Sequence, residues 1–266
     1  MSVKRRDLVS FFAGTILGTT LGRTSFAQVG PKLPTEASLQ SGDLLWPKKP
    51  GAVIPYDLRP GEEENDQRTR WLKEKDEFIK RARASNNPDL NAAADEIAPL
   101  TFNDFRARYL RNLAPGALTP YGLNDIAAVG HVAIVEVDGA GQRWIIEALW
   151  TPEGVTRSTF TDWVKGRPGE IVWQGRLRGV EQKDRAKVAD EARRWLHKPY
   201  DFWNFHLVDT SGFYCSKLVW FCVQQSLGIA VDGDVNPKRH FWLSPKQVLY
   251  SDKIEKLVDP GDYSVE

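Results

Sequence analysis

Two apolar runs on either side of a short glycine-containing turn constrain the fold of this chain most. Residues 131–137 and 143–149 are dense in β-branched and apolar side chains, and the turn between them begins with Asp138-Gly139. Apolar runs of this length around such a turn are typical of an antiparallel hairpin. Further short strands are expected at residues 155–160, 170–177 and 42–46, the last of them ending at Pro47. The sequence therefore predicts an antiparallel sheet.

Helical patterns surround these strands. Residues 61–84 form a strongly charged segment whose narrow apolar stripe includes Trp71 and Phe78, which is typical of a helix with one buried edge. Other helices are expected at residues 102–113, 182–197 and 214–227, and a short one at Ser244-Pro245. Together the helices and strands predict an α+β fold.

Both cysteines of the chain lie in the segment GFYCSKLVWFC, residues 212–222. On one helix, Cys215 and Cys222 would be two turns apart, with about 10.5 Å between their Cα atoms at 1.5 Å per residue. A disulfide needs Cα atoms within about 7 Å of each other. The two cysteines therefore cannot pair.

Cys215 lies where a loop of Ser, Gly and aromatic residues turns into the expected helix. At that position the helix dipole and the free backbone N–H groups favour the thiolate, so Cys215 is a candidate nucleophile. The alternative is that Cys215 is a small core residue. Cys222 lies inside an apolar run and is expected to be core. The four histidines form no chelating pair and there is no Cys-x-x-Cys spacing, so no metal site is expected.

A thiol nucleophile needs a base, and the base needs a group that orients it. His131 begins the first hairpin strand. If the turn is an odd-membered loop centred on Gly139, His131 lies directly opposite Glu147 on the same face of the sheet. An even-membered loop would place Glu147 on the other face. His131 could instead be a strand-edge histidine bound to the backbone, and His206, nine residues before Cys215, is the rival base.

The first 27 residues have the pattern of an export signal peptide. Lys4-Arg5-Arg6 is followed by an apolar run and by Ser25-Phe26-Ala27, a small-x-small cleavage pattern. The apolar run is shorter than the roughly 20 residues that a membrane span needs. The arginine pair indicates a twin-arginine signal, and an ordinary secretory signal is the alternative. We therefore expect a periplasmic or secreted protein with no stable transmembrane segment in the mature chain.

The charge balance excludes one broad class of partner. Removing residues 1–27 changes the formal net charge from +1 to about −2, because that segment holds four basic residues and one acidic residue. Proteins that bind nucleic acids usually present a strongly basic face. We therefore expect no nucleic-acid partner and a single domain over residues 28–266.

The order of three motifs resembles a known family. The segments SGDLLWP, GHVAIVEVDG with RWIIEA, and KPYDFWNF with FYCSKLVWFC resemble the permuted papain-like branch of the NlpC superfamily, the YiiX/YebB-like cysteine hydrolases. The resemblance covers residues 41–46, 130–149 and 198–250. It implies Cys215 as nucleophile, His131 as base and Glu147 as orienting group, with Tyr214 and Asp43 in the substrate and oxyanion neighbourhood. Residues 61–113 fall in a stretch without counterpart, and we interpret them as a helical insertion or a lid.

The resemblance also implies a fold and a reaction. The fold would be a circularly permuted papain-like one, with a small antiparallel barrel-like sheet packed on the helix that carries Cys215. The reaction would be hydrolysis of an amide bond through a thioester acyl-enzyme, with a peptide or acyl substrate such as a cell-wall peptide and with no cofactor. The alternatives are a lipid ester hydrolase or acyltransferase of the same fold, a non-catalytic envelope binding module, and a structural envelope protein.

Overall fold

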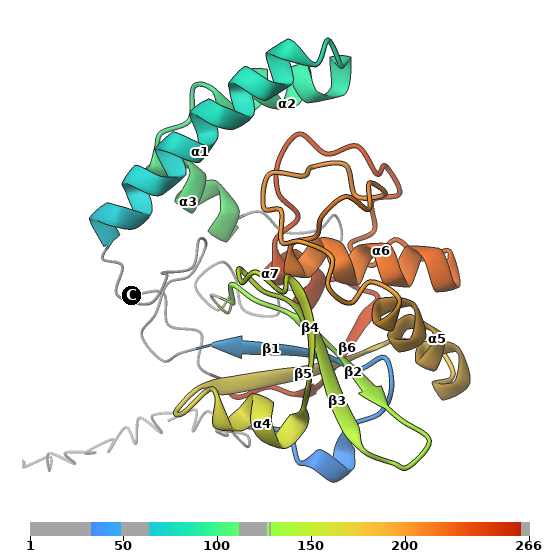
Figure 1. Cartoon of the computed structure of the whole chain (residues 1–266). Coiled ribbons are helices and arrows are strands. Elements are labelled where there is room, and N and C mark those ends of the chain that lie inside the picture. The colour runs from blue at the N-terminus through green and yellow to red at the C-terminus, as the bar shows by residue number, and fades with distance from the viewer. Residues whose placement is uncertain (1–32, 49–63, 112–126, 128, 262–266) are drawn as a thin grey trace, which may run out of the picture.

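The computed structural model describes residues 33–48, 64–111, 127 and 129–261 (Figure 1). The expected export signal, residues 1–27, lies outside the described residues, as do both ends of the expected insertion, 61–63 and 112–113. No helix in the described part of the chain is long and apolar enough to cross a membrane.

Six strands form one antiparallel sheet in the order β4-β3-β2-β1-β5-β6. The strands are β1 Leu44–Lys48, β2 Ala133–Val137, β3 Arg143–Ala148, β4 Val155–Thr159, β5 Ile171–Leu177 and β6 Ile254–Val258. Five of them confirm the strands expected from the sequence, and β6 is an additional edge strand. Strand β1 runs through Pro47 instead of ending there. Only Leu44 and Leu45 of β1 pair with β2, so Pro47 has a neighbouring strand on one side alone, where a missing N–H is tolerated.

The turn of the β2–β3 hairpin is centred on Ala140 and not, as expected, on Gly139. Val137 of β2 pairs with Arg143 of β3, which puts the midpoint of the loop one residue later. The Asp138 carboxylate favours this turn, because it accepts a hydrogen bond from the N–H of Ala140 at 2.9 Å. Short polar side chains at the start of a turn commonly hold the backbone in this way.

The shifted turn changes the position of the expected base and its partner. The observed register, continued along both strands, places Ala133 opposite Glu147, so the expected direct opposition of His131 and Glu147 is wrong. The loop nevertheless has an odd number of residues. Because side chains two residues apart on a strand share a face, His131 remains diagonal to Glu147 on the same side.

Helices cover both faces of the sheet (Figure 1). The helices of this part are α4 Phe160–Lys165, α5 Gln182–Arg193, α6 Cys215–Leu227 and α7 Pro245–Leu249. Ile134 and Ile146 belong to the apolar cluster that contains Leu218 of α6, whereas Val135 belongs to the cluster that contains Trp163 of α4. Alternate strand residues point to opposite faces. Helix α6 therefore packs on one face and α4 on the other, and the architecture is α+β.

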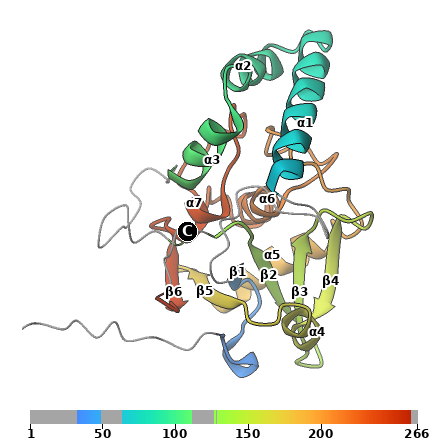
Figure 2. The same cartoon turned by 90° about the vertical axis from the view of Figure 1, so that its left-hand side faces the viewer.

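Three helices lie on the α6 side of the molecule, away from α4 (Figures 1 and 2). They are α1 Glu64–Ala84, α2 Pro88–Ile97 and α3 Phe102–Arg111. Helix α2 was not expected, although Asn87 caps it by accepting hydrogen bonds from the N–H groups of its first turn. The apolar stripe predicted for α1 is buried: Trp71 lies 6.2 Å from Trp203 and Phe78 lies 5.5 Å from it, between ring centroids. The three helices therefore share one apolar core with the sheet domain.

Candidate active site

Cys215 is the first residue of α6, at the position that the sequence predicted. Tyr214 is the N-cap residue, in an extended conformation, and its side chain makes no capping hydrogen bond. The N–H groups of a first helical turn have no partner inside the helix. At the start of α6 these donors, and the positive end of the helix dipole, therefore lie beside the Cys215 sulfur. The Cys215 side chain is almost buried, at 5% exposure.

The two neighbours of Cys215 are both fastened to Leu243. The hydroxyl of Tyr214 accepts a hydrogen bond from the Leu243 N–H at 3.3 Å. The hydroxyl of Ser216 donates to the Leu243 carbonyl at 2.6 Å. Burial raises the pKa of Tyr214, which keeps its hydroxyl neutral. These bonds hold the start of α6, and with it the Cys215 backbone, against the segment before α7.

His131 lies just before β2, where the sheet has not yet begun, so its ring can reach both α6 and β3. Its Nε2 lies 2.8 Å from Glu147 Oε2, and its ring lies close enough to Cys215 for the thiol to raise the pKa of His131. Because Nε2 bonds to Glu147, Nδ1 is the ring nitrogen left for the sulfur. The His131 side chain is 16% exposed.

The electrostatic surroundings of His131 favour the imidazolium. Burial alone lowers the pKa of His131, but the charge and hydrogen bond of Cys215, followed by those of Glu147, outweigh burial and raise the pKa to about 10. An acceptor on each side of a histidine ring stabilises its protonated form. The protonated form of His131 is therefore stabilised from two sides, by Cys215 and by the Glu147 carboxylate.

The buried Glu147 carboxylate accepts hydrogen bonds from three side chains. Its Oε2 accepts hydrogen bonds from His131, from Trp163 Nε1 at 3.0 Å and from Arg167 Nη2 at 2.8 Å. Arg167 also donates to Oε1 at 2.9 Å, and its guanidinium lies 4.3 Å from the centre of the Trp163 ring. Burial raises the pKa of Glu147, but the bonds and charges of His131, Arg167 and Trp163 outweigh it and lower that pKa. Glu147 is thus a charged, fully bonded carboxylate.

Trp163 and Arg167 were not predicted as site residues from the sequence. Trp163 belongs to α4, a helix that was not expected, and Arg167 lies in the loop after it. Neither residue belongs to a motif or has a spacing relative to Glu147 that indicates contact. Glu147 and Arg167 meet only because α4 folds back over the face of β3. No signal in the sequence would have found them.

Two other residues singled out from the sequence lie elsewhere. Asp43 is buried, and its carboxylate accepts hydrogen bonds from Gln174 at 2.8 Å and from Arg176 at 2.7 and 2.9 Å. These contacts include none of the residues around Cys215. His206, the rival base, forms a backbone bridge with Lys238. The structure thus brings Tyr214, His131 and Glu147 to Cys215, and gives Asp43 a separate network.

Cys222 lies in a different environment from Cys215. Both thiols are free, so the expected absence of a bond between them is confirmed. Cys222 is completely buried in the middle of α6, and burial raises its pKa well above the ordinary value. Cys222 is therefore a core residue. Within the described ranges, no group of three or more His, Cys, Asp or Glu side chains is arranged to hold a metal ion.

More than half of the chain matches a known protein family. Residues 100–253 match the family described as permuted papain-like amidase enzyme, YaeF/YiiX, C92 family. That range includes Cys215, His131 and Glu147 and does not include Asp43.

Individual relatives are similar over part of the chain. The uncharacterized protein YiiX of Escherichia coli strain K12 is 37% identical over 95 residues, which are 35% of this chain and 46% of that protein. The alignment thus spans about half the length of that relative. The solved structure of the metalloprotein YiiX from Escherichia coli O157:H7 is 15% identical, with a TM-score of 0.44 over 82% of this chain and 96% of that one.

Proposed function

Because the family match covers more than half of it, this chain belongs to the permuted papain-like amidases, and on that premise we propose that Cys215, His131 and Glu147 form a catalytic triad. One observation carries the proposal: His131 bonds to Glu147 and lies close enough to Cys215 for that thiol to raise its pKa, beside a helix start whose N-cap side chain makes no capping hydrogen bond. A nucleophile, a base and an orienting group in hydrogen-bonded sequence are the arrangement that activates a thiol.

The reaction is amide hydrolysis in two stages. The Cys215 thiolate attacks the amide carbon and forms a C–S bond, and the carbonyl oxygen takes up the negative charge. The N–H of Cys215 at the start of α6 stabilises that oxyanion. The His131 imidazolium then donates its proton to the amide nitrogen, the C–N bond breaks, and the amine leaves a thioester on Cys215.

Water completes the cycle. Neutral His131 accepts a proton from a water molecule as its oxygen attacks the thioester carbon. The C–S bond breaks, the carboxylic acid leaves, and the thiolate and imidazolium are restored. Throughout, Glu147 holds the imidazole by Nε2 and stabilises its charged form, while Trp163 and Arg167 keep Glu147 in place.

Residues 1–27 give the proposal a location and a substrate class. As a signal peptide, they would deliver the enzyme to the periplasm or the cell exterior. Peptides of the cell wall are the amide substrates abundant there, and we propose them as the natural substrate class. The same thioester could also form from a lipid ester, so the test below includes both substrates.

Mass spectrometry of the mature protein incubated in parallel with muropeptides and with acyl esters tests this function. We expect an acyl adduct on Cys215 and release of an amine from muropeptides, both abolished in Cys215→Ala and retained in Cys222→Ala. His131→Ala should abolish turnover, whereas His206→Ala should not, and Glu147→Gln should cost less than His131→Ala. Turnover by Cys215→Ala would refute the triad, and turnover of acyl esters alone would refute the amide substrate.

A further inference from the structure

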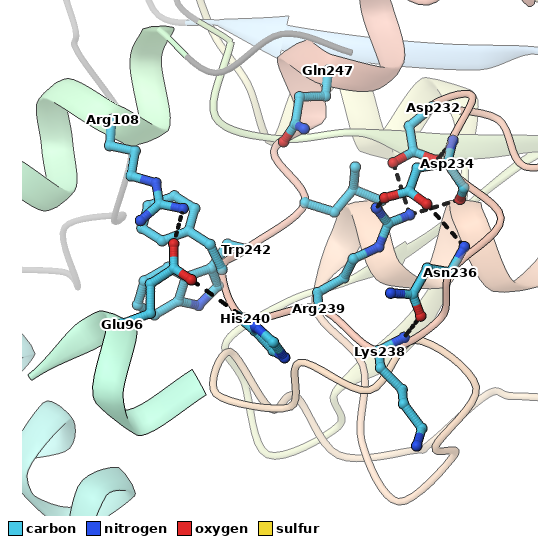
Figure 3. Close-up of a pocket in the computed structure, with 12 residues that line it drawn as sticks. Glu96, Arg108, Asp232, Asp234, Asn236, Lys238, Arg239, His240, Trp242 and Gln247 are labelled. Carbon is cyan, nitrogen blue, oxygen red and sulfur yellow. Dashed lines mark hydrogen bonds and ion pairs between the residues drawn. The ribbon is translucent and has the colours of Figure 1, made fainter. Parts of the chain in front are cut away.

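A pocket lies between the helices α2 and α3 and the segment from Asp232 to Gln247 (Figure 3). Its volume is about 390 Å³, which is within the range of about 300–1,000 Å³ found for ligand sites. Phe241 and Trp242 line it together with charged and amide side chains. The pocket therefore lies between the inserted helices and the domain that carries Cys215.

Every carboxylate that lines this pocket already has a cationic partner. Glu96 pairs with Arg108, and Figure 3 shows this pair on one side of the pocket. Asp232 and Asp234 both pair with Arg239 on the opposite side. The lining holds three acidic side chains and three Lys or Arg side chains, of which Lys238 pairs with Asp89 outside the lining. The acceptor capacity of the lining is thus largely used within the protein.

Two amide side chains in the lining present hydrogen-bond donors. The Asn236 oxygen accepts a hydrogen bond from the Lys238 N–H at 3.0 Å. The Gln247 oxygen accepts one from the Ser244 N–H at 2.7 Å, as part of the capping box of α7. Because each amide oxygen is fixed in this way, each amide presents its NH₂ group as a donor. In Figure 3, Gln247 lies between the two groups of ion pairs.

The pocket is connected to the nucleophile through Leu243. This residue lines the pocket, and its N–H and carbonyl bond to Tyr214 and Ser216, the two neighbours of Cys215. A group held in the pocket would therefore rest on the same backbone that positions the start of α6. That placement is suited to a part of the substrate that does not itself react.

We propose that this pocket binds a carboxylate of the peptide substrate, using the NH₂ groups of Asn236 and Gln247 as donors. Arg108 adds further N–H groups, since its side chain is 37% exposed and its bond to Glu96 uses one terminal nitrogen. A lining whose carboxylates are paired and whose two amide NH₂ groups remain as donors selects a ligand with acceptors, and a carboxylate is the strongest of these. The inference rests on the proposed amidase function for its substrate class, but the binding can be measured without turnover.

Two isosteric substitutions isolate the donors. Gln247→Glu keeps the oxygen that caps α7, since Glu is also a capping-box residue, and replaces the NH₂ group by a carboxylate oxygen. Asn236→Asp likewise keeps the oxygen that accepts from the Lys238 N–H and replaces the NH₂ group by a carboxylate oxygen, at an exposed position. Gln182→Glu is the matched control, because it makes the same change at the exposed first residue of α5. Circular dichroism and thermal melts check that all three variants fold.

The probe is N-acetyl-tetraalanine, used as the free acid and as its C-terminal amide. Both forms are titrated into Cys215→Ala protein, up to millimolar concentrations, by ligand-observed NMR. We expect the acid to bind roughly tenfold more tightly than the amide or better, as for a charge-assisted hydrogen bond. Gln247→Glu and Asn236→Asp should each remove that preference, and Gln182→Glu should retain it.

Equal binding of acid and amide, including no detectable binding of either, overturns the carboxylate site. So does a preference for the acid that survives both substitutions in the pocket. If the acid is preferred and the preference is lost in both variants, but no peptide is cleaved by the protein with Cys215 intact, the pocket stands and the amidase proposal fails. The two proposals can therefore fail separately.

Discussion

Replacing Glu147 by Gln should lower the pKa of His131. The pKa of His131 is raised from 6.5 to about 10 against the opposing effect of burial, first by Cys215 and then by Glu147. Gln cannot supply the negative charge, and an opposite charge at hydrogen-bond distance changes a pKa by about one to three pH units. We therefore expect His131 in Glu147→Gln to titrate between about pH 7 and 9. Cys215→Ala should lower the pKa of His131 more than Glu147→Gln does, because Cys215 raises that pKa more than Glu147 does.

Replacing Arg167 by Met should have the opposite effect. Arg167 Nη2 and His131 Nε2 both lie 2.8 Å from Glu147 Oε2. The two nitrogens are thus at most about 5.6 Å apart, where two positive charges repel by about 3 kcal/mol at an effective dielectric constant of 20. Removing the guanidinium removes that repulsion. The pKa of His131 should therefore rise by about one pH unit or more.

The assay is an NMR titration of the histidine ring nitrogens between pH 5 and 11, in which a raised pKa of His131 appears as an imidazolium signal that persists to the upper end of the range. His131→Ala assigns the signal, and the four histidines of the chain keep the spectrum simple. Arg157→Met is the matched control. Arg157 bonds to the buried carboxylate of Glu136 at 2.6 Å and lies 3.7 Å from the centre of the Trp144 ring, which reproduces the surroundings of Arg167 elsewhere on the sheet.

The control should leave the pKa of His131 unchanged. A rise of that pKa in Glu147→Gln, or a fall in Arg167→Met, would refute the electrostatic account of this site. Equal changes in the Arg157 and Arg167 variants would show that loss of a buried ion pair, and not its position next to His131, is responsible.

Mild iodoacetamide treatment followed by peptide mapping should label Cys215 before Cys222, because Cys222 is fully buried and its pKa is raised; equal labelling would contradict this. Lys217 is buried without a hydrogen-bond partner, and burial lowers its pKa to about 7. Between about pH 7 and 10.5, the unfolded chain therefore binds a proton at Lys217 that the native chain lacks. Lys217→Met should thus raise the free energy of unfolding by about 1–4 kcal/mol at pH 7, with a smaller gain at pH 10, as measured by urea denaturation. Replacing Arg5 and Arg6 by Lys should block export, as measured by cell fractionation, whereas an ordinary secretory signal would tolerate the change.

The candidate nucleophile could be predicted because its signals are local. The loop that becomes a helix at Cys215 and the glycine that ends the helix at Gly228 both lie within a few residues of the features that they define, and α6 begins and ends there. Gly228 takes a φ of 68°, in the left-handed region that favours glycine. The capping box at Ser244 is equally local, and α7 follows it. Signals of this kind depend on short-range hydrogen bonds, which the order of residues alone establishes.

Features that depend on contacts between distant segments could not be predicted in this way. The one-residue shift of the β2–β3 turn is fixed by the pairing of Val137 with Arg143 across the two strands, a register that the β-branched pattern does not report. The edge strand β6 needs β5 as a partner, and two charged side chains in its five residues leave no continuous apolar run by which it could be recognised alone. In both cases the deciding hydrogen bonds exist only once the strands have met.

By itself, the sequence of this protein determined the candidate residues: a thiol at a helix start, a histidine at the start of a strand, and an acid at a position on the next strand where it needs a partner. Only the tertiary structure decided that Glu147 meets His131 diagonally, that Arg167 and Trp163 hold Glu147, and that a pocket adjoins Leu243. The physical reason is the separation along the chain of the residues that interact. Helix caps and strand periodicity are set by neighbours a few residues apart, whereas the charge on a buried carboxylate depends on every segment that the fold brings within a few ångströms of it.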